Sequence, residues 1–267
     1  MLGWMRAFLA FAMVAAATPF LLLWQMLAMK AGFDERPAPR LWHRLIVKAL
    51  GFRVHVTGRL AAERPLLVAA NHVSWSDIMV LGSIADVQFI AKSEMAGWPV
   101  IGFLARYQRT IFVERERRRK SGEQVNEIAG RLAGGKAVVL FAEGTTHDGN
   151  SPGPFKSTLF GAAAAAIANG AAAQVYVQPV AIAYTRFHGL PMGRRHRPHA
   201  AWIGDQDLVP HILPLIREGG VDVEVRFGRP FALDASNDRK QAARRAEAEV
   251  RAMMGAALAA PLPARDR

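Results

Sequence analysis

His72 and Asp77 are the two side chains in this sequence whose types and spacing suit proton transfer. Histidine titrates near neutral pH, and a neighbouring carboxylate fixes its tautomer and stabilises the imidazolium ion formed when the ring takes a proton. On one ideal helix, residues five apart point about 140° away from each other. The pair can therefore meet only at a loop-to-helix junction, with His72 in the loop and Asp77 in the first helical turn, and with Ser74 or Ser76 as the candidate helix cap.

The segment from Asn71 to Asp77 directly follows the apolar run 66–70, which has the composition of a buried strand. Open α/β sheets bind ligands in the crevice outside the carboxyl ends of their strands, so such a strand delivers His72 to a substrate. The alternative is a structural loop histidine followed by an acid that only caps a helix. The spacing by itself does not exclude that alternative.

The rest of the chain supplies the elements of an α/β fold, because short strand-like segments alternate with helical patterns. Helices are predicted at 41–50, around residues 125–132 and at 158–169, and a last one running from a cap at Asp234 or Ser236 towards Gly255, with Val250 and Met254 on its apolar side. We predict a mixed central sheet of about seven strands flanked by helices. The predicted strands are 54–57, 66–70, 87–91, 110–113, 138–141, 175–184 and 221–227.

A segment of membrane length lies at the amino terminus, where residues 7–29 contain no charged side chain. About 20 apolar residues in a helix match the bilayer core, and Trp4 and Trp24 suit its interfacial zones. We expect an uncleaved anchor that spans the bilayer or lies along it, in preference to a signal peptide cleaved near the small residues 15–17. Residues 36–39, with two prolines, are expected as a linker, which divides the chain into a membrane-anchoring segment at 1–35 and a catalytic domain at 36–267.

Composition narrows the partners and the chemistry. The 34 Lys and Arg residues exceed the 22 Asp and Glu residues and give a net charge of +12. Anionic lipid, nucleic acid and an acidic carrier protein all match such a charge. The sequence has no cysteine, which excludes disulfides, thiolate metal sites and a cysteine nucleophile.

Four segments together resemble one known family, the glycerolipid acyltransferases that include the 1-acyl-glycerol-3-phosphate acyltransferases. The segment Asn71 to Asp77 resembles its His-x4-Asp signature. The other three motifs follow in the family's order as Thr-Ile-Phe-Val-Glu-Arg at 110–115, Phe-Ala-Glu-Gly-Thr at 141–145 and Val-Gln-Pro-Val-Ala-Ile at 177–182. Each motif alone is weak, whereas four in order identify the chain as a member of the family.

The resemblance implies that His72 removes the proton from a lysolipid hydroxyl, which then attacks the thioester of an acyl donor, with Asp77 as the charge partner. It also implies acceptor binding by five further residues. A guanidinium at Arg115 suits phosphate or carboxylate, although the basic run that follows it is typical of a solvated surface. Gly144 permits close backbone approach. The implied acceptor-binding residues are Lys92, Arg115, Glu143, Gly144 and Thr145.

One position departs from the family pattern. The family commonly has arginine after Glu-Gly-Thr, associated with the acceptor phosphate, and this chain has Thr146 there. The residues that follow, 146–157, look similar to those of lyso-ornithine lipid acyltransferases. Either Lys156 replaces the missing charge or the acceptor carries an amino-acid headgroup.

Rival interpretations lack their key features. A serine hydrolase would need a Gly-x-Ser-x-Gly elbow, which the sequence does not contain, and the scattered histidines show no metal-ligand spacing. A non-catalytic basic protein that binds membranes or nucleic acid is the alternative of another class, although the basic patches 117–120 and 194–197 contain no interleaved aromatic residues.

We therefore expect an O-acyltransferase at the cytoplasmic face of a membrane. It would use an acyl carrier protein or coenzyme A thioester, no metal or organic cofactor and no nucleic acid. The expected acceptor is 1-acyl-sn-glycerol-3-phosphate, giving phosphatidic acid, with lyso-ornithine lipid as the alternative. The sequence predicts neither a preferred length of the fatty acyl chain nor an oligomeric state.

Overall fold

The computed structural model describes residues 1–113, 121–204, 206–234 and 238–262; the side chains of Lys92 and of residues 121–126 also lie outside the description. Within these ranges the chain forms a mixed nine-stranded sheet in the order β1-β8-β6-β2-β5-β3-β4, with β7 and β9 pairing with β6. The strands are β1 (Phe52–Thr57), β2 (Leu66–Ala70), β3 (Gln88–Lys92), β4 (Ile111–Val113), β5 (Ala137–Phe141), β6 (Val175–Phe187), β7 (Leu190–Pro191), β8 (Val221–Phe227) and β9 (Phe231–Leu233).

All seven predicted strands are present, which confirms the α/β class. The short strands β7 and β9 were not predicted, because two or three residues do not display a periodic pattern. Strands β5 and β6 both run parallel to β2, whereas β8 runs antiparallel to β6.

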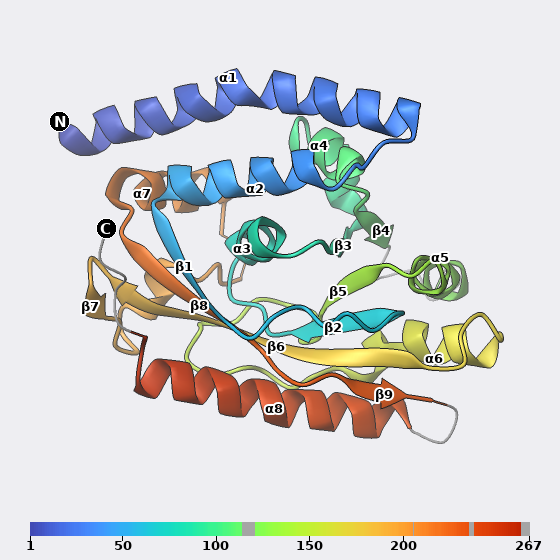
Figure 1. The fold of residues 1–267 in the computed structure, drawn as a ribbon. Helices are drawn as coiled ribbons and strands as arrows, with labels where there is room; N and C mark the ends of the chain where they lie inside the picture. Colours follow the sequence, from blue (N-terminus) through green and yellow to red (C-terminus); the bar gives the residue numbers. More distant parts are fainter. Residues whose placement is uncertain (114–120, 205, 235–237, 263–267) are drawn as a thin grey trace.

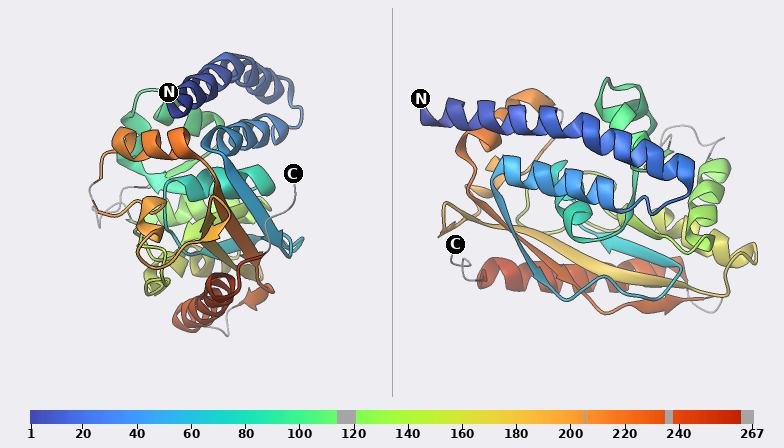
Figure 2. Two further views of the ribbon diagram at one scale, coloured as in Figure 1. Left: turned by 90° about the vertical axis from the view of Figure 1, so that its left-hand side faces the viewer. Right: turned by 45° about the horizontal axis from the view of Figure 1, so that its top comes forward.

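Helices cover both faces of the sheet (Figures 1 and 2). On the upper side in Figure 1 lie α1 and α2, with α3, α4 and α7 near them; α8 runs beneath the sheet, and α5 and α6 lie at one end. Within the described ranges, short 3-10 turns lie at Ser93–Gly97, Ser157–Phe160 and Arg197–His199. The helices are α1 (Leu2–Ala31), α2 (Pro37–Leu50), α3 (Ser76–Ile84), α4 (Ile101–Tyr107), α5 (Ser121–Ala133), α6 (Gly161–Ala168), α7 (Leu208–Glu218) and α8 (Arg239–Ala259).

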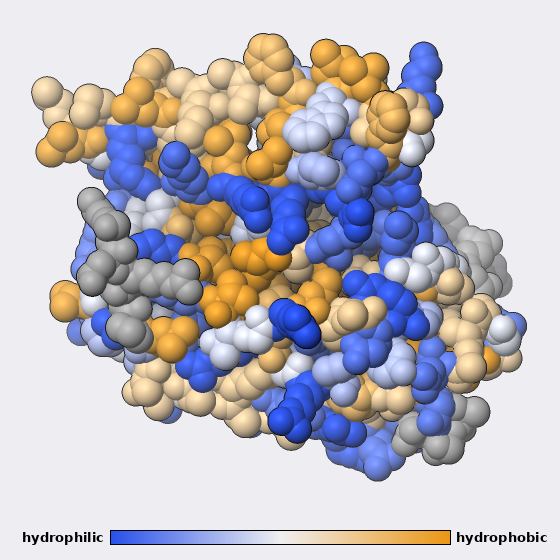
Figure 3. Space-filling view, in the orientation of Figure 1, coloured by the Kyte–Doolittle hydropathy of each residue, from blue (hydrophilic) through white to orange (hydrophobic). Residues whose placement is uncertain are grey.

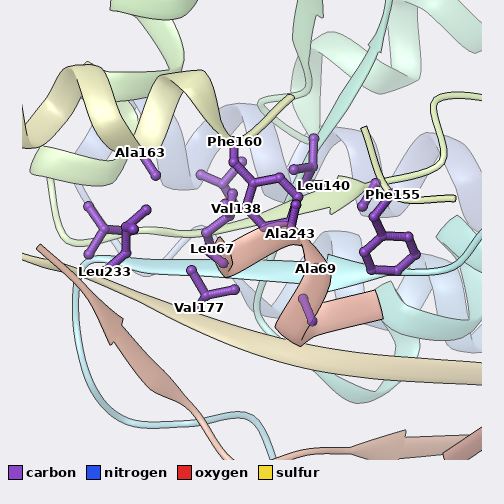
Figure 4. Close-up of a cluster of buried hydrophobic side chains, with 14 of the residues drawn as sticks. Leu67, Ala69, Val138, Leu140, Phe155, Phe160, Ala163, Val177, Leu233 and Ala243 are labelled. Atoms are coloured by element: carbon purple, nitrogen blue, oxygen red, sulfur yellow. The ribbon is translucent and has the colours of Figure 1, made fainter. Parts of the chain in front are cut away.

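Two hydrophobic clusters fill the space between the layers, and β2 contributes to both because successive side chains point to opposite faces. Leu67 and Ala69 pack towards α6 and α8 in the cluster shown in Figure 4. Leu66, Val68 and Ala70 pack towards α2, α3 and α7. All five residues of β2 are buried, which places this strand at the centre of the molecule.

Two helix starts differ from the predictions. The expected linker at residues 36–39 is the first turn of α2, since proline is tolerated where the backbone N–H has no helical partner. Helix α8 begins at Arg239, capped by Asp238, whose Oδ1 accepts a hydrogen bond from Lys240 N at 3.1 Å. The predicted cap at Asp234 is therefore wrong, and Ser236 lies outside the described residues. Val250 and Met254 are buried as expected.

Helix α1 packs along the body over most of its length. Near its start, Trp4 stacks under the Arg217 guanidinium, 4.3 Å from the ring centroid, and near its end Gln25 Nε2 donates to Tyr107 O at 3.0 Å. Between them, Trp42 of α2 donates to Thr18 Oγ1 at 3.1 Å. The outer side of α1 is apolar, and hydrophilic residues lie beneath it in Figure 3.

Candidate active site

The site forms where β2 and β5 end side by side. Ala70 pairs with Phe141 at the last residue of each strand, so the loops that leave the two strands start as neighbours. Ala142 N donates to Ala70 O, and His147 N donates to His72 O, both at 3.0 Å. Asn71 continues the ladder towards β6, since its side-chain amide exchanges two hydrogen bonds with the backbone of Ile182. The backbone at His72 is thus held from both sides.

The His72 and Asp77 side chains meet across the junction between this loop and α3. His72 Nδ1 lies 2.8 Å from Asp77 Oδ2. Helix α3 starts at Ser76, which puts Asp77 in its first turn as the spacing required. An ionised carboxylate only accepts hydrogen bonds, so Nδ1 carries the proton and Nε2 presents a lone pair. That tautomer suits a general base.

Asp77 also accepts hydrogen bonds from the backbone of the loop before α3. A capping role of this kind was predicted for Ser74 or Ser76. Asp77 Oδ2 accepts from Val73 N at 2.7 Å and from Ser74 N at 2.9 Å. Neither Ser74 nor Ser76 caps α3, and the prediction of a serine cap is wrong. The carboxylate is fully buried, and the donors around it compensate for the burial of its charge.

The imidazole of His72 is fixed in its plane by an aromatic neighbour. It stacks on Phe141 with ring centroids 3.9 Å apart and planes inclined by 13°. The exposed fraction of the His72 side chain is 18%, so a substrate can reach the ring. The arrangement holds one nitrogen against Asp77 and the ring face against Phe141.

Glu143 is buried beside the histidine and supports the two loops. Its Oε1 accepts from His72 N at 2.8 Å, and its Oε2 accepts from Gly153 N and lies 3.0 Å from His147 Nε2. Burial raises the pKa of Glu143 to about 7, against the two backbone donors, which lower it. Both of its oxygens have protein partners, and these contacts hold the loops after β2 and β5 together. The expected acceptor-binding role of Glu143 stays a prediction.

Gly144 and Thr145 lie at the surface of the same turn. Gly144 has a φ of +74°, a conformation that favours glycine. A Cβ there would stand 3.1 Å from Lys156 Nζ, which places the lysine side chain over this turn. Thr145 is exposed. These two residues and Lys156 are accessible to an acceptor headgroup.

Thr146 occupies the position at which the family commonly has arginine. Its hydroxyl donates to the backbone carbonyl of Trp202, and Trp202 N in turn donates to Val73 O at 2.9 Å. Thr146 therefore ties the loop after β5 to the histidine loop through a third segment of chain. It carries no charge to offer to a phosphate.

Two expected contacts cannot be placed. The backbone of Lys92 ends β3 and pairs with Val113, but its side chain lies outside the described part of the chain, as does the whole of Arg115. Among the described residues, no group of three or more His, Asp or Glu side chains is arranged to hold a metal ion.

Sequence reasoning missed Tyr184, whose hydroxyl donates to Asp77 Oδ1 at 2.8 Å. The available signal was a tyrosine that ends the stretch 175–184 directly after the apolar residues 180–183, since a buried tyrosine hydroxyl usually needs a partner. Phe141 was named only within the third motif, and its stacking on His72 was not predicted, because a stacking partner that ends another strand leaves no local pattern.

An α/β sheet with a histidine and carboxylate pair at its carboxyl edge is suited to general-base chemistry. Comparisons with known proteins show the family to which the chain belongs. Residues 51–183 match the family model described as Acyltransferase. The chain is 51% identical to a lyso-ornithine lipid O-acyltransferase of Brucella abortus, with 97% of each chain covered. It is 48% identical to one of Rhizobium meliloti, covering 95% of this chain and 87% of the relative. The chain belongs to the acyltransferase family and is an acyltransferase enzyme.

Two further matches carry a different name. A 1-acyl-sn-glycerol-3-phosphate acyltransferase of Neisseria meningitidis is 39% identical, but over 44% of this chain and 46% of that protein. The crystal structure of a 1-acyl-sn-glycerophosphate acyltransferase of Thermotoga maritima superposes with a TM-score of 0.64 over 98% of this chain and 97% of that one, at 21% identity. This likeness confirms the fold, including the long amino-terminal helix.

Proposed function

We propose that the protein is a lyso-ornithine lipid O-acyltransferase, which transfers a fatty acyl group from a thioester donor to the hydroxyl of a lyso-ornithine lipid. The observation that supports this proposal most strongly is the 51% identity to a relative of that name, over 97% of each chain. The acceptor put first from the sequence pattern, 1-acyl-sn-glycerol-3-phosphate, has support only from more distant or partial relatives. The alternative acceptor is therefore the better supported one.

The proposed reaction uses His72 as the base. Its Nε2 takes the proton of the acceptor hydroxyl while the oxygen attacks the thioester carbonyl, so a C–O bond forms and the C–S bond breaks. The imidazolium formed is stabilised by Asp77 and returns its proton to the leaving thiolate. Because Phe141 and Asp77 hold the ring in one orientation, the base is preorganised before the substrates arrive.

The headgroup contacts proposed here suit an amino acid better than a phosphate monoester. An ornithine joined to its acyl chain through one amino group retains a carboxylate and an ammonium group. Lys156 stands over Gly144 beside exposed Thr145 and offers one cation to the carboxylate. Asp148, one residue after His147, already accepts hydrogen bonds from Asn150 N and Nδ2, but it is exposed and supplies a negative charge that can attract the ammonium group. Thr146 lacks the guanidinium that would pair with a phosphate dianion.

An apolar cavity suits a fatty acyl chain. It has a volume of about 280 Å³ and lies among α1, α2, α3, α4 and α7, and its lining includes Trp75, the residue before α3, and Ile78 on α3, the helix that carries Asp77. Trp42, Ile46 and Ile212 also line it. We assign this cavity to an acyl chain of the donor or the acceptor, which would lie close to His72.

Membrane association is proposed for α1. Its sequence is long and apolar enough to cross a membrane by length and composition. Since it is docked on α2, α4 and α7 over most of its length, we propose that it lies along one leaflet at the cytoplasmic face. A cleft of about 800 Å³ between α1, α2 and β1, lined by Arg6, Arg40, Arg44 and Lys48, sets positive charge beside the headgroups.

Acceptor competition tests the proposal. Purified protein in lipid vesicles receives equal amounts of lyso-ornithine lipid and 1-acyl-sn-glycerol-3-phosphate, with acyl carrier protein or coenzyme A thioesters in separate reactions, and mass spectrometry counts the products. We expect ornithine lipid to form at least ten times faster, about 1.4 kcal/mol between transition states. A preference for the phosphate acceptor would contradict the proposal.

Lys156→Met refines the same experiment. We expect a KM for lyso-ornithine lipid about tenfold higher, because a charge-assisted contact is removed. Lys240→Met, at an exposed position in the first turn of α8, is the matched control and should keep the wild-type KM. Equal KM values in the two variants would remove Lys156 from the headgroup site.

A further inference from the structure

Tyr184 lies behind the catalytic pair and is almost completely buried. It sits in β6, and 1% of its surface is exposed. Its hydroxyl donates to Asp77 Oδ1 at 2.8 Å. The other oxygen, Oδ2, receives His72 Nδ1, Val73 N and Ser74 N. Among the described residues, Tyr184 is thus the side chain that occupies Oδ1 and leaves Oδ2 for the histidine.

The direction of the hydrogen bonds follows from the number of protons. Tyr184 has one hydroxyl proton, and the carboxylate has none to give, so that proton points at Asp77. Ser76 Oγ lies 2.7 Å from the tyrosine oxygen and must therefore donate to it. The result is a chain in which Ser76 donates to Tyr184, Tyr184 donates to Asp77, and Asp77 accepts from His72. Such chains polarise one another in a buried site.

The tyrosine keeps its proton under all working conditions. Burial, followed by the charge of Asp77, raises the pKa of Tyr184 well above its usual value. Its edge-on contact with Phe52, at 6.1 Å between ring centroids, and its place in the β6 backbone hold the ring in the core. The hydroxyl is a permanent donor with a fixed position.

We infer that Tyr184 is a positioning residue for acyl transfer: its hydroxyl sets the rotation of the Asp77 carboxylate, and with it the strength of the contact between Asp77 and His72. The inference rests on the proposed role of His72 as the base. Without this donor the carboxylate carries more negative charge towards the imidazole, and its orientation is fixed less tightly because only Val73 N and Ser74 N, both at Oδ2, still hold it besides the histidine. The first effect makes the pair bind a proton more tightly, and the second lowers the fraction of enzyme with a correctly held base.

Tyr184→Phe removes one oxygen atom and keeps the ring. We expect kcat to fall about 10- to 100-fold, the range for a hydrogen bond to a charged group, with KM for both substrates within about twofold of wild type. The acidic limb of the pH–rate profile should move to higher pH. A merely structural role would lower the melting temperature and leave the profile unchanged.

Two controls bracket the result. Tyr176→Phe, on the same strand but at its amino end, removes a hydroxyl that accepts from Gln174 Nε2 and should retain wild-type kinetics. Ser76→Ala removes the hydroxyl 2.7 Å from the tyrosine oxygen, leaves the Ser74 hydroxyl as a second neighbour, and should show the same shift of profile with a smaller fall in kcat. If Tyr184→Phe does not fold, the profile of Ser76→Ala decides.

Glu143 is the other titratable carboxyl at His72, with His147 against it. The profile shift caused by Tyr184→Phe should therefore persist in the Glu143→Gln background. Unchanged kcat and an unmoved profile in both Tyr184→Phe and Ser76→Ala would overturn the inference. A fully active His72→Ala variant would instead overturn the proposed function, so the two failures are distinguishable.

Discussion

Gly82 of α3 lies directly against the imidazole of His43 on α2. A Cβ at residue 82 would stand 2.2 Å from His43 Nδ1, and His43 is itself buried between Trp42 and Phe89. This contact sets how closely α2 approaches the helix that carries Asp77.

We predict that Gly82→Ala destabilises the protein by about 1–3 kcal/mol, because the imidazole, which packs against Trp42 and Phe89, must shift to make room for the methyl group. Thermal unfolding in detergent measures the effect. Gly130→Ala is the matched control: residue 130 lies at an exposed position of α5 with open space around its Cα, so alanine there should be neutral or stabilising. Equal melting temperatures for the two variants would contradict the packing argument.

Substitutions of His72 and of Asp77 should have different effects on kcat and on the melting temperature. His72→Ala should lower kcat by about 10²- to 10⁴-fold, the range for a general base, with little change in melting temperature. Asp77→Asn should lower both, since asparagine has one acceptor oxygen for the four groups that now donate to the carboxylate. Rates of acyl transfer and melting curves on the same preparations separate the two patterns. An Asp77→Asn variant with wild-type stability would show that its carboxylate does not hold the loop.

Thr146→Arg should change which acceptor is preferred. A guanidinium at this position offers forked donors to a phosphate, so kcat/KM for 1-acyl-sn-glycerol-3-phosphate relative to lyso-ornithine lipid should rise about tenfold, or about 1.4 kcal/mol. Thr146→Val loses the bond to Trp202 without adding charge and controls for that loss. A ratio that moves equally in both variants would assign the effect to the loop and not to the cation.

Glu143 should make stability depend on pH. Burial raises its pKa to about 7 from 4.5, so the folded protein binds this proton more tightly than the unfolded chain. Stability from this residue is therefore greatest at low pH and is lost as pH rises from 4.5 to about 7, by about 3 kcal/mol at most. Glu143→Gln lacks this loss, so it should gain stability relative to wild type between pH 5 and pH 8 in urea unfolding. A constant difference across that range would contradict the assignment.

The elements that position the site were predictable because burial leaves a local pattern. The run 66–70 is buried at every residue and coincides with β2, and the five-residue spacing of His72 and Asp77 requires the junction that is found. What could not be predicted depends on contacts between segments distant in sequence. Tyr184 lies 107 residues from Asp77, and the Glu143 carboxylate reaches a backbone N–H 71 residues away.

Two local predictions were also wrong. Proline at residue 37 marks a helix start and not a linker, and a serine beside an acid at a helix start does not become the cap when the acid itself accepts the loop N–H groups. The acceptor could not be read from the motifs, because Thr146 shows which charge is missing and does not show what replaces it.

The docking of α1 along the body has a consequence for kinetics. An enzyme seated in one leaflet, as proposed, meets its lysolipid by lateral diffusion within a two-dimensional film. The rate would then depend on the mole fraction of lysolipid in that film and not on its amount per volume. Adding inert phospholipid at a constant total of acceptor would slow the reaction by dilution within the surface.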